Sequence, residues 1–282
     1  MFPLFATQLS MFGIMVAAGI GLGLLLIFST AKKQGLDDDM VVNMIIFALP
    51  GGFFLAHVFN DVFYYPQKVL KDPMSLLYVT EGLSSYGGMI GGLFVMFLFL
   101  KWNKARFLPH SDIMIVGFAL AMIFGRLGCA LAFDHPGYPT TFFLGMKDSE
   151  GIIRHNLGLY ECLVFIPIFI TLYLVHRKPQ PEGMITGLFA VIYAPIRFLL
   201  DFLRIPPSST ELGIMGDVRY FGLTPAQYAS IMALVLGVFI LRYAFRVNKP
   251  KGRMLPSDDM GLMVPRAQKE DENDSIETEE LE

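Results

Sequence analysis

Arg126 is the residue whose type and position most clearly suggest chemistry in this sequence. It lies within an apolar run, residues 114–133, that is long enough to cross a lipid bilayer. A guanidinium stays protonated in proteins, and a charge placed in hydrocarbon costs about 2.5 to 3.5 kcal/mol on insertion scales. Because intramembrane charges are functional by default, we expect Arg126 to belong to a site.

Arg197 is a second arginine inside an apolar run, and charged residues follow it at helical spacing. Asp201 lies one turn and Arg204 about two turns further along. Arg197 and Asp201 are spaced for a helical ion pair, and Glu161, at the start of another apolar run, is able to neutralise Arg126. One interpretation is therefore a set of structural ion pairs. The other is an anion site, because a planar guanidinium suits a phosphate.

Apolar runs of membrane-spanning length carry these residues, since about 20 residues cross a bilayer as a helix. There are seven, at residues 9–30, 40–59, 86–100, 112–133, 157–175, 184–203 and 225–245. Hydrophobic residues make up 54% of the chain and charged residues 17%, which excludes a soluble globular domain of this length. The predicted fold class is all-α: a polytopic integral membrane protein of about seven transmembrane helices.

The distribution of basic residues predicts the orientation of the chain. One set of connecting segments carries 12 lysines and arginines, and the other set carries six. Because cytoplasmic loops are the more basic ones, we expect the N-terminus outside and the C-terminus in the cytoplasm, with external segments at about 60–85, 134–156 and 204–224. Residues 1–248 then form a seven-helix transmembrane domain, and residues 249–282 form an acidic cytoplasmic tail that we expect to be disordered.

With this orientation, polar residues of the spans collect at the level of the outer leaflet. The excess of arginine at the depth of lipid phosphates favours the anion site over purely structural ion pairs. The residues at this level are Tyr86, Arg126, Tyr160, Glu161 and Arg197, with His135 and His155 in the segment 134–156.

The remaining composition excludes other classes of protein. The net charge is −3, and ten of the 25 acidic residues lie from Asp258 onward, so the membrane part alone is basic. Nothing in this pattern suggests that the chain binds nucleic acid. Cys129 and Cys162 lie in apolar runs and share no partner spacing, so we predict neither a disulfide framework nor a metal site.

Separated stretches of the sequence resemble the motifs of one known family. The first is Gly82-Leu83-Ser84-Ser85-Tyr86-Gly87-Gly88-Met89-Ile90-Gly91, with tyrosine where that family usually has histidine. The second is Gly125-Arg126-Leu127-Gly128-Cys129, with cysteine in the family's asparagine position. In register after it come Asp134, where the family has glutamate, then Gly137 and Pro139-Thr140. These stretches resemble the prolipoprotein diacylglyceryl transferases, the bacterial family that begins lipoprotein maturation.

Two further stretches continue the resemblance in the same order. His155 with Leu159-Tyr160-Glu161 is similar to His-Pro-x-x-Leu-Tyr-Glu without its proline. Tyr193, Arg197-Phe198, Asp201 and Arg204 are similar to Tyr-Gly-x-x-Arg-Phe-x-x-Glu-x-x-Arg, with aspartate for glutamate. Gly222-Leu223-Thr224 and Gln227 resemble the start of the family's last span. The ordered set, over residues 82–237, is far more specific than any one motif.

The resemblance implies transfer of a diacylglyceryl group from phosphatidylglycerol to the lipobox cysteine thiol of a prolipoprotein signal peptide. The products are a thioether and glycerol phosphate, and the reaction implies no metal and no soluble cofactor. Charge that develops on the leaving phosphate needs pre-placed cations. The residues implied for catalysis are Tyr86, Arg126, Asp134, His135, Tyr193 and Arg197; those implied for substrate binding are Gly87, Gly88, Gly128, Cys129, Gly137, His155, Tyr160, Glu161, Asp201 and Arg204.

The identity of the general base is open in this sequence. A thiol of pKa about 8.5 needs help to become a thiolate, and a tyrosine of pKa about 10 is a poorer base than a histidine near about 6.5. Tyr86 either acts as the base beside an arginine or hydrogen-bonds the phosphate, and in the second case His135 or His155 is the base. We favour a histidine of the outer segment. Cys129 also removes an amide, which Asp134 is placed to replace.

We therefore expect an enzyme of the bacterial inner membrane, a monomer whose site faces the outer leaflet. Its expected partners are phosphatidylglycerol, a prolipoprotein signal peptide and membrane lipid. The alternative is a non-catalytic or redirected paralogue that binds or transports anionic phospholipid. Against transport, the sequence has no repeated half and no charged path toward the cytoplasmic face.

Overall fold

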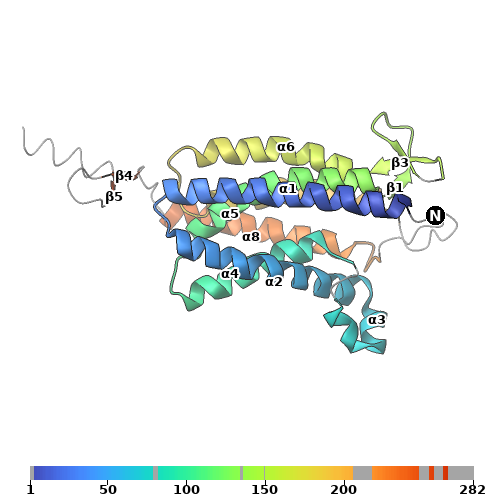
Figure 1. The fold of residues 1–282 in the computed structure, drawn as a ribbon, viewed down its shortest axis with the longest axis horizontal. Helices are drawn as coiled ribbons and strands as arrows, with labels where there is room; N and C mark the ends of the chain where they lie inside the picture. The colour runs from blue at the N-terminus through green and yellow to red at the C-terminus, as the bar shows by residue number, and fades with distance from the viewer. Residues whose placement is uncertain are drawn as a thin grey trace, which may run out of the picture.

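Seven helices of membrane-spanning length and composition build the described part of the chain (Figure 1). The computed structural model describes residues 3–78, 82–133, 136–148, 150–205, 218–247, 254–256 and 263–265. The seven helices are α1 (Pro3–Lys33), α2 (Asp38–Tyr64), α4 (Ser85–Trp102), α5 (Phe107–Ala132), α6 (Leu157–His176), α7 (Met184–Leu200) and α8 (Pro225–Val247). Each predicted span overlaps one of them, so the all-α, seven-span prediction is confirmed.

The helices associate mainly in pairs. The most extensive contacts join α1 to α5, α2 to α4, α7 to α8 and α5 to α6. Glycines allow the backbones to approach closely: a Cβ built on Gly117 of α5 would lie 2.7 Å from the carbonyl oxygen of Gly23 in α1. The α2–α4 pair contacts the other helices much less, chiefly α1 and α5. A buried hydrophobic core joins this pair to α1 and α5, and we call the boundary between the pair and the other helices the seam.

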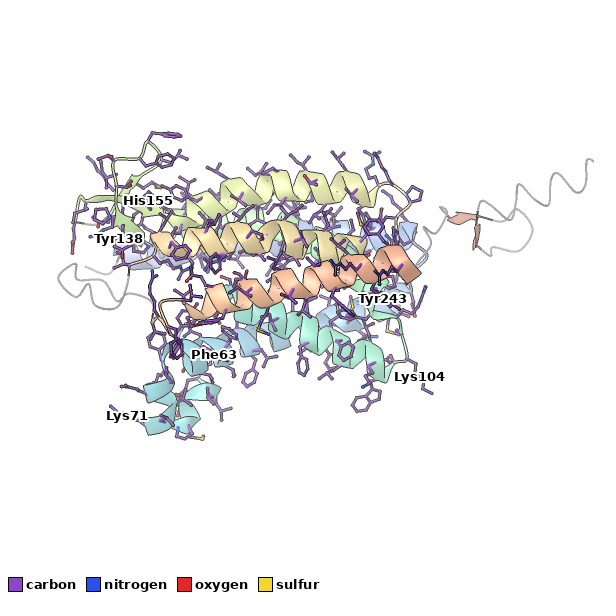
Figure 2. The ribbon with its side chains drawn as sticks, turned by 180° about the vertical axis from the view of Figure 1, so that it is seen from behind. Phe63, Lys71, Lys104, Tyr138, His155 and Tyr243 are labelled. Carbon is purple, nitrogen blue, oxygen red and sulfur yellow. The ribbon has the colours of Figure 1, made fainter. Side chains whose placement is uncertain are left out.

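Short elements gather at one end of the bundle. These are α3 (Pro66–Lys71), a 3-10 helix η1 (Pro73–Leu77), and the strands β1 (Pro136–Pro139), β2 (Met146–Lys147) and β3 (Ile153–Asn156). The strands form an antiparallel sheet in the order β1-β3-β2, an addition to the all-α prediction. In Figure 2, Phe63, Lys71, Tyr138 and His155 lie at this end, and Lys104 and Tyr243 lie at the other.

The sheet is tied to the helices beneath it. Asn156 caps α6 by accepting from Leu159 N at 3.0 Å and donates to the carbonyl oxygen of Ala130 in α5 at 2.9 Å. Arg154 is fully buried and contacts Asp148 at 2.6 Å, which holds the pKa of that carboxyl below its usual value. Residues 136–148 and 150–156 therefore form an ordered cover over the ends of α5 and α6.

Part of the predicted tail forms a small ribbon. Strands β4 (Met254–Pro256) and β5 (Met263–Pro265) pair antiparallel. The rest of the predicted disordered tail, like Asp134 and His135, lies outside the described residues.

Candidate active site

Arg126 lies near the sheet end of α5, with its side chain 2% exposed. Its Nη2 atom is 3.1 Å from Oε2 of Glu161 in α6 and donates to Oγ of Ser85, the first residue of α4, at 2.5 Å. Its Nε and Nη1 atoms are buried and have no hydrogen-bond partner among the described residues. Nη2 therefore anchors the guanidinium, and Nε and Nη1 each have N–H groups to donate to a ligand.

Glu161 lies between two arginines that come from different helices. Its Oε1 atom is 3.6 Å from Nε of Arg197 in α7. Its Oε2 atom, which pairs with Arg126, also accepts from the hydroxyl of Tyr193 at 3.0 Å. The carboxylate thus brings residues of α5, α6 and α7 to one point, and all four side chains are almost completely buried.

Asp201 forms ion pairs with two arginines, Arg197 and Arg204. Arg197 Nη1 donates to Asp201 Oδ1, and Nε of Arg204 lies 2.9 Å from the same oxygen. The two ion pairs of the structural interpretation, Arg126–Glu161 and Arg197–Asp201, are therefore both present. Among the described residues, these pairs join three guanidinium groups to two carboxylates. We call these five residues the arginine cluster.

Thr224, directly before α8, forms a hydrogen bond to the arginine cluster. Thr224 Oγ1 donates to Asp201 Oδ2 and also accepts from Gln227 N at 3.2 Å. Gln227 Oε1 accepts from Thr224 N at 3.0 Å, which completes a reciprocal capping box. Gln227 Nε2 donates to the carbonyl oxygen of Phe198 at 3.2 Å, so the start of α8 is fixed against α7.

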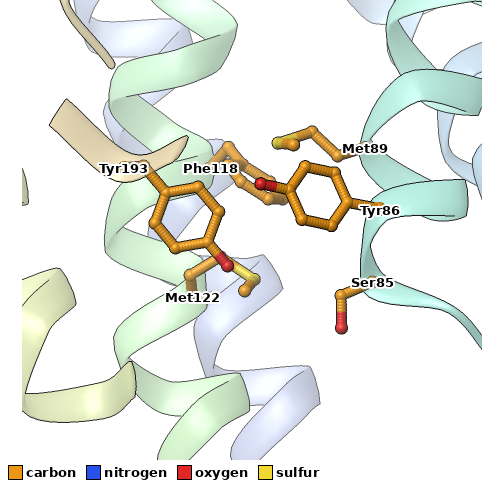
Figure 3. A pocket seen from close by; sticks show the side chains of 6 residues that line it. All are labelled: Ser85, Tyr86, Met89, Phe118, Met122 and Tyr193. Atoms are coloured by element: carbon orange, nitrogen blue, oxygen red, sulfur yellow. The ribbon is translucent and has the colours of Figure 1, made fainter. Parts of the chain in front are cut away.

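A small cavity lies beside the cluster, between α4, α5 and α7 (Figure 3). It has room for about one water molecule. The Tyr86 and Tyr193 rings face it with their centroids 6.3 Å apart, and the Tyr86 hydroxyl lies 2.7 Å from Ser230 Oγ in α8. The cavity is too small for an organic phosphate. The lining residues are Ser85, Tyr86, Met89, Phe118, Met122 and Tyr193.

His155 and Gly137 lie in the sheet that covers this end of the bundle. His155 Nδ1 is 2.8 Å from the Tyr160 hydroxyl, and partial burial lowers the pKa of the imidazole below 6.5. Gly137 forms an isolated bridge with Arg204. A Cβ on Gly137 would lie 2.6 Å from the carbonyl oxygen of Leu203, so a larger residue would push the sheet away from the cluster.

The structure places the predicted residues in three groups. Arg126, Tyr193, Arg197, Glu161, Asp201 and Arg204 come together with Tyr86 at the adjoining cavity. His155, Tyr160 and Gly137 form the cover. Gly87 and Gly88 pack against Phe59 and Ala56 of α2, Gly128 packs against Phe12 and Met15 of α1, and buried Cys129 meets Gly158 of α6.

Some residues of the site were not in the predicted set. Ser85 and Ser230 contact Arg126 and Tyr86 across the seam between α4 and the other helices. No local sequence signal identifies such long-range contacts. Thr224 had a signal, because Thr-x-x-Gln is a capping-box pattern, but its bond to Asp201 depends on how α7 and α8 pack.

No group of three or more His, Cys, Asp or Glu side chains in the described residues is arranged to hold a metal ion. Fold and cluster together define a class: a multi-pass membrane protein with a buried cluster of arginine–carboxylate ion pairs near one end of its helices. Residues 1–243 match the family described as prolipoprotein diacylglyceryl transferase, and this chain belongs to that family.

Bacterial relatives agree with this assignment. A phosphatidylglycerol–prolipoprotein diacylglyceryl transferase of Clostridioides difficile is 30% identical over 253 residues, which cover 88% of this chain and 96% of the relative. A protein of the same name from Clostridium tetani is 28% identical over 249 residues, covering 85% and 95%. Another from Nitratidesulfovibrio vulgaris is 32% identical over 210 residues, covering 73% and 76%.

Proposed function

We propose that this chain transfers the diacylglyceryl group of phosphatidylglycerol to the lipobox cysteine of a prolipoprotein. The observation that carries the proposal is the arginine cluster, in which two nitrogens of buried Arg126 have no hydrogen-bond partner among the described residues. The names and coverage of the bacterial relatives support the same reaction.

The charge balance of the reaction fits the cluster. The cysteine thiolate attacks the glyceryl carbon that carries the phosphate oxygen, a C–S bond forms and the C–O bond breaks. The electron pair of that bond leaves on the phosphate, so a phosphodiester with one negative charge becomes a phosphomonoester with about two. Arg126 and Arg197 of the cluster are pre-placed cations for the developing charge.

His155 is the proposed general base, in preference to Tyr86. Its pKa lies below 6.5, so the imidazole is neutral at neutral pH and able to take the thiol proton. Tyr86 is hydrogen-bonded to Ser230. His135 is the alternative base, and Asp134 is proposed to contact the headgroup where the family's asparagine is replaced by Cys129.

The proposed setting is the inner membrane, with the sheet end of the bundle toward the outer leaflet. The count of 12 against six basic residues supports this orientation. A monomer suffices, because one chain supplies every residue of the cluster. Cysteines introduced at Lys71 and Lys104 test the orientation: an impermeant thiol reagent added to intact cells should label the first and not the second.

The test of the function is complementation in bacteria depleted of their own prolipoprotein diacylglyceryl transferase. Wild-type chain should restore processing of a reporter prolipoprotein, and Arg126→Ala expressed at the same level should not. Failure of well-inserted wild-type protein to rescue would contradict the proposal. Saturable binding of anionic phospholipid without processing would then identify the non-catalytic paralogue.

A further inference from the structure

Three hydroxyl groups line the small cavity beside the arginine cluster: those of Ser85, Tyr86 and Tyr193. Figure 3 shows the rings of Tyr86 and Tyr193 facing each other, with Ser85 below Tyr86. Each hydroxyl has one proton to donate. Assigning those protons shows which hydroxyl is available to a ligand.

Two of the three protons are already used inside the protein. The Tyr193 hydroxyl donates to Glu161 Oε2 at 3.0 Å. Ser230 Oγ donates its own proton to the carbonyl oxygen of Ala226 at 2.8 Å, so in its 2.7 Å contact with Tyr86 it must be the acceptor. Tyr86 therefore donates to Ser230, and neither tyrosine has a second proton for a substrate.

Ser85 differs from both tyrosines. It accepts from Arg126 Nη2 at 2.5 Å, which uses a lone pair of Oγ and leaves the hydroxyl proton unassigned among the described residues. The side chain is exposed, and it lies in the first turn of α4, where the helix dipole favours a negative ligand. Arg126 also polarises the hydroxyl, because its cationic donor is bound to the same oxygen.

We propose that Ser85 is a catalytic residue that donates its hydroxyl proton in a hydrogen bond to a non-bridging phosphate oxygen of the lipid substrate. The inference rests on the proposed transferase function. Arg126 holds the serine oxygen and offers its remaining nitrogens to the same phosphate. The bond strengthens as the C–O bond breaks and charge accumulates on the phosphate, so it stabilises the transition state more than the bound substrate.

The test compares purified wild type with Ser85→Ala, Ser85→Thr and Ser84→Ala, using phosphatidylglycerol and a lipobox peptide in detergent micelles. A hydrogen bond to a charged group is worth about 10- to 150-fold, so Ser85→Ala should lower kcat by that factor with little change in KM. Ser85→Thr keeps the hydroxyl and should stay within about threefold of wild type on the same grounds. Ser84→Ala is the matched control, since Ser84 Oγ only caps α4 by accepting from Gly87 N.

A second substrate separates direct contact with phosphate from simple positioning of Arg126. Phosphatidylglycerol with sulfur in place of one non-bridging oxygen exists as two diastereomers, and sulfur is the weaker acceptor. Wild type should discriminate between them, and Ser85→Ala should lose most of that discrimination. A serine that only positions Arg126 would lower the rate and leave the discrimination unchanged.

The outcomes are distinct. Inactive, well-folded wild type would contradict the transferase function itself. Active wild type with Ser85→Ala at wild-type kcat would overturn the role of Ser85 alone. The role would also be overturned if Ser84→Ala lost as much kcat as Ser85→Ala, if Ser85→Thr were as slow as Ser85→Ala, or if Ser85→Ala discriminated between the diastereomers as strongly as wild type.

Discussion

The Arg126 guanidinium uses one nitrogen for two partners and has two further nitrogens for a ligand, which a lysine with its single nitrogen is unable to reproduce. Nη2 contacts both Ser85 Oγ and Glu161 Oε2, while Nε and Nη1 have no hydrogen-bond partner in the part of the chain that the structure describes. A lysine ammonium keeps the charge but lacks the planar fork. The geometry of the guanidinium, beyond its charge, therefore matters at this site.

Arg126→Lys should reduce the rate of transfer by about 100-fold or more, the loss typical of a removed pre-placed donor. Arg106→Lys is the control, because that arginine forms an exposed pair with Glu182 at the other end of α5 and should contribute about 0 to 1 kcal/mol to stability. Initial rates of thioether formation on matched amounts of folded protein measure the difference. Equal rates for the two variants would contradict the role of the planar fork.

The protonation state of His155 should control the rate of transfer at acidic pH. The neutral imidazole is the base, and burial lowers its pKa from the ordinary value, so the fall of kcat/KM with decreasing pH should lie at a lower pH than for an unperturbed imidazole. His155→Gln should lose this acid limb and about 100-fold or more in rate. A pH profile of both proteins measures it. If His155→Gln kept both the acid limb of the pH profile and the wild-type rate, the general base would be another group.

At the scale of helices, Gly158 sets the distance between α5 and α6. A Cβ on Gly158 would lie 2.7 Å from Ala130 N and 2.9 Å from the carbonyl carbon of Cys129, and neither backbone atom is able to move alone. Glu161 follows Gly158 by three residues, and Arg126 precedes Cys129 by three. The close approach of the helices and the 3.1 Å contact of Arg126 with Glu161 therefore lie on the same helix faces.

Gly158→Ala should force the helices apart, cost about 1 to 3 kcal/mol of stability and reduce transfer. Gly21→Ala is the control, since a Cβ on Gly21 of α1 meets nothing within 4 Å. Thermal unfolding in detergent and the transfer rate should both fall for the first variant only. A Gly158→Ala protein with wild-type stability and activity would show that the helix spacing is not critical.

Thr224 links the start of α8 to the arginine cluster. Thr224→Val removes the cap of α8, worth about 1 kcal/mol, and the bond to Asp201 that helps to orient Arg197. We expect reduced thermal stability and reduced transfer, with both largely restored in Thr224→Ser. If the serine and valine variants behave alike in melting and transfer assays, the hydroxyl has no such role.

The seven membrane-spanning helices could be predicted from the sequence, because the length of an apolar run determines whether a segment is able to cross a membrane. The sequence also predicted that Arg126, Arg197 and Glu161 lie at one depth along the helices, because the cost of a charge in hydrocarbon limits where an arginine is tolerated. It did not reveal Ser85 or Ser230, whose contacts cross the seam between α4 and its neighbours. The sheet was missed because short strands such as Met146–Lys147 lack an alternating pattern.

At the scale of the whole molecule, the site lies on the seam between the α2–α4 pair and the other helices. Hydrogen bonds cross this seam from Arg126 to Ser85, between Tyr86 and Ser230, and from Tyr220 to the carbonyl oxygen of Phe63. The cavity on the seam has room for about one water molecule, so a lipid headgroup bound in this cavity would require the seam to widen. These hydrogen bonds and the buried core shared with α1 and α5 oppose such a widening.

The most direct test of the central claim follows both products of one reaction. Purified chain is incubated with phosphatidylglycerol and a lipobox peptide, and the modified peptide and the free glycerol phosphate are quantified together. We predict that they appear in a one-to-one ratio and that Arg126→Ala, folded and present in equal amount, yields neither. Binding of phosphatidylglycerol by wild type without release of glycerol phosphate would contradict the account and identify a lipid-binding protein instead.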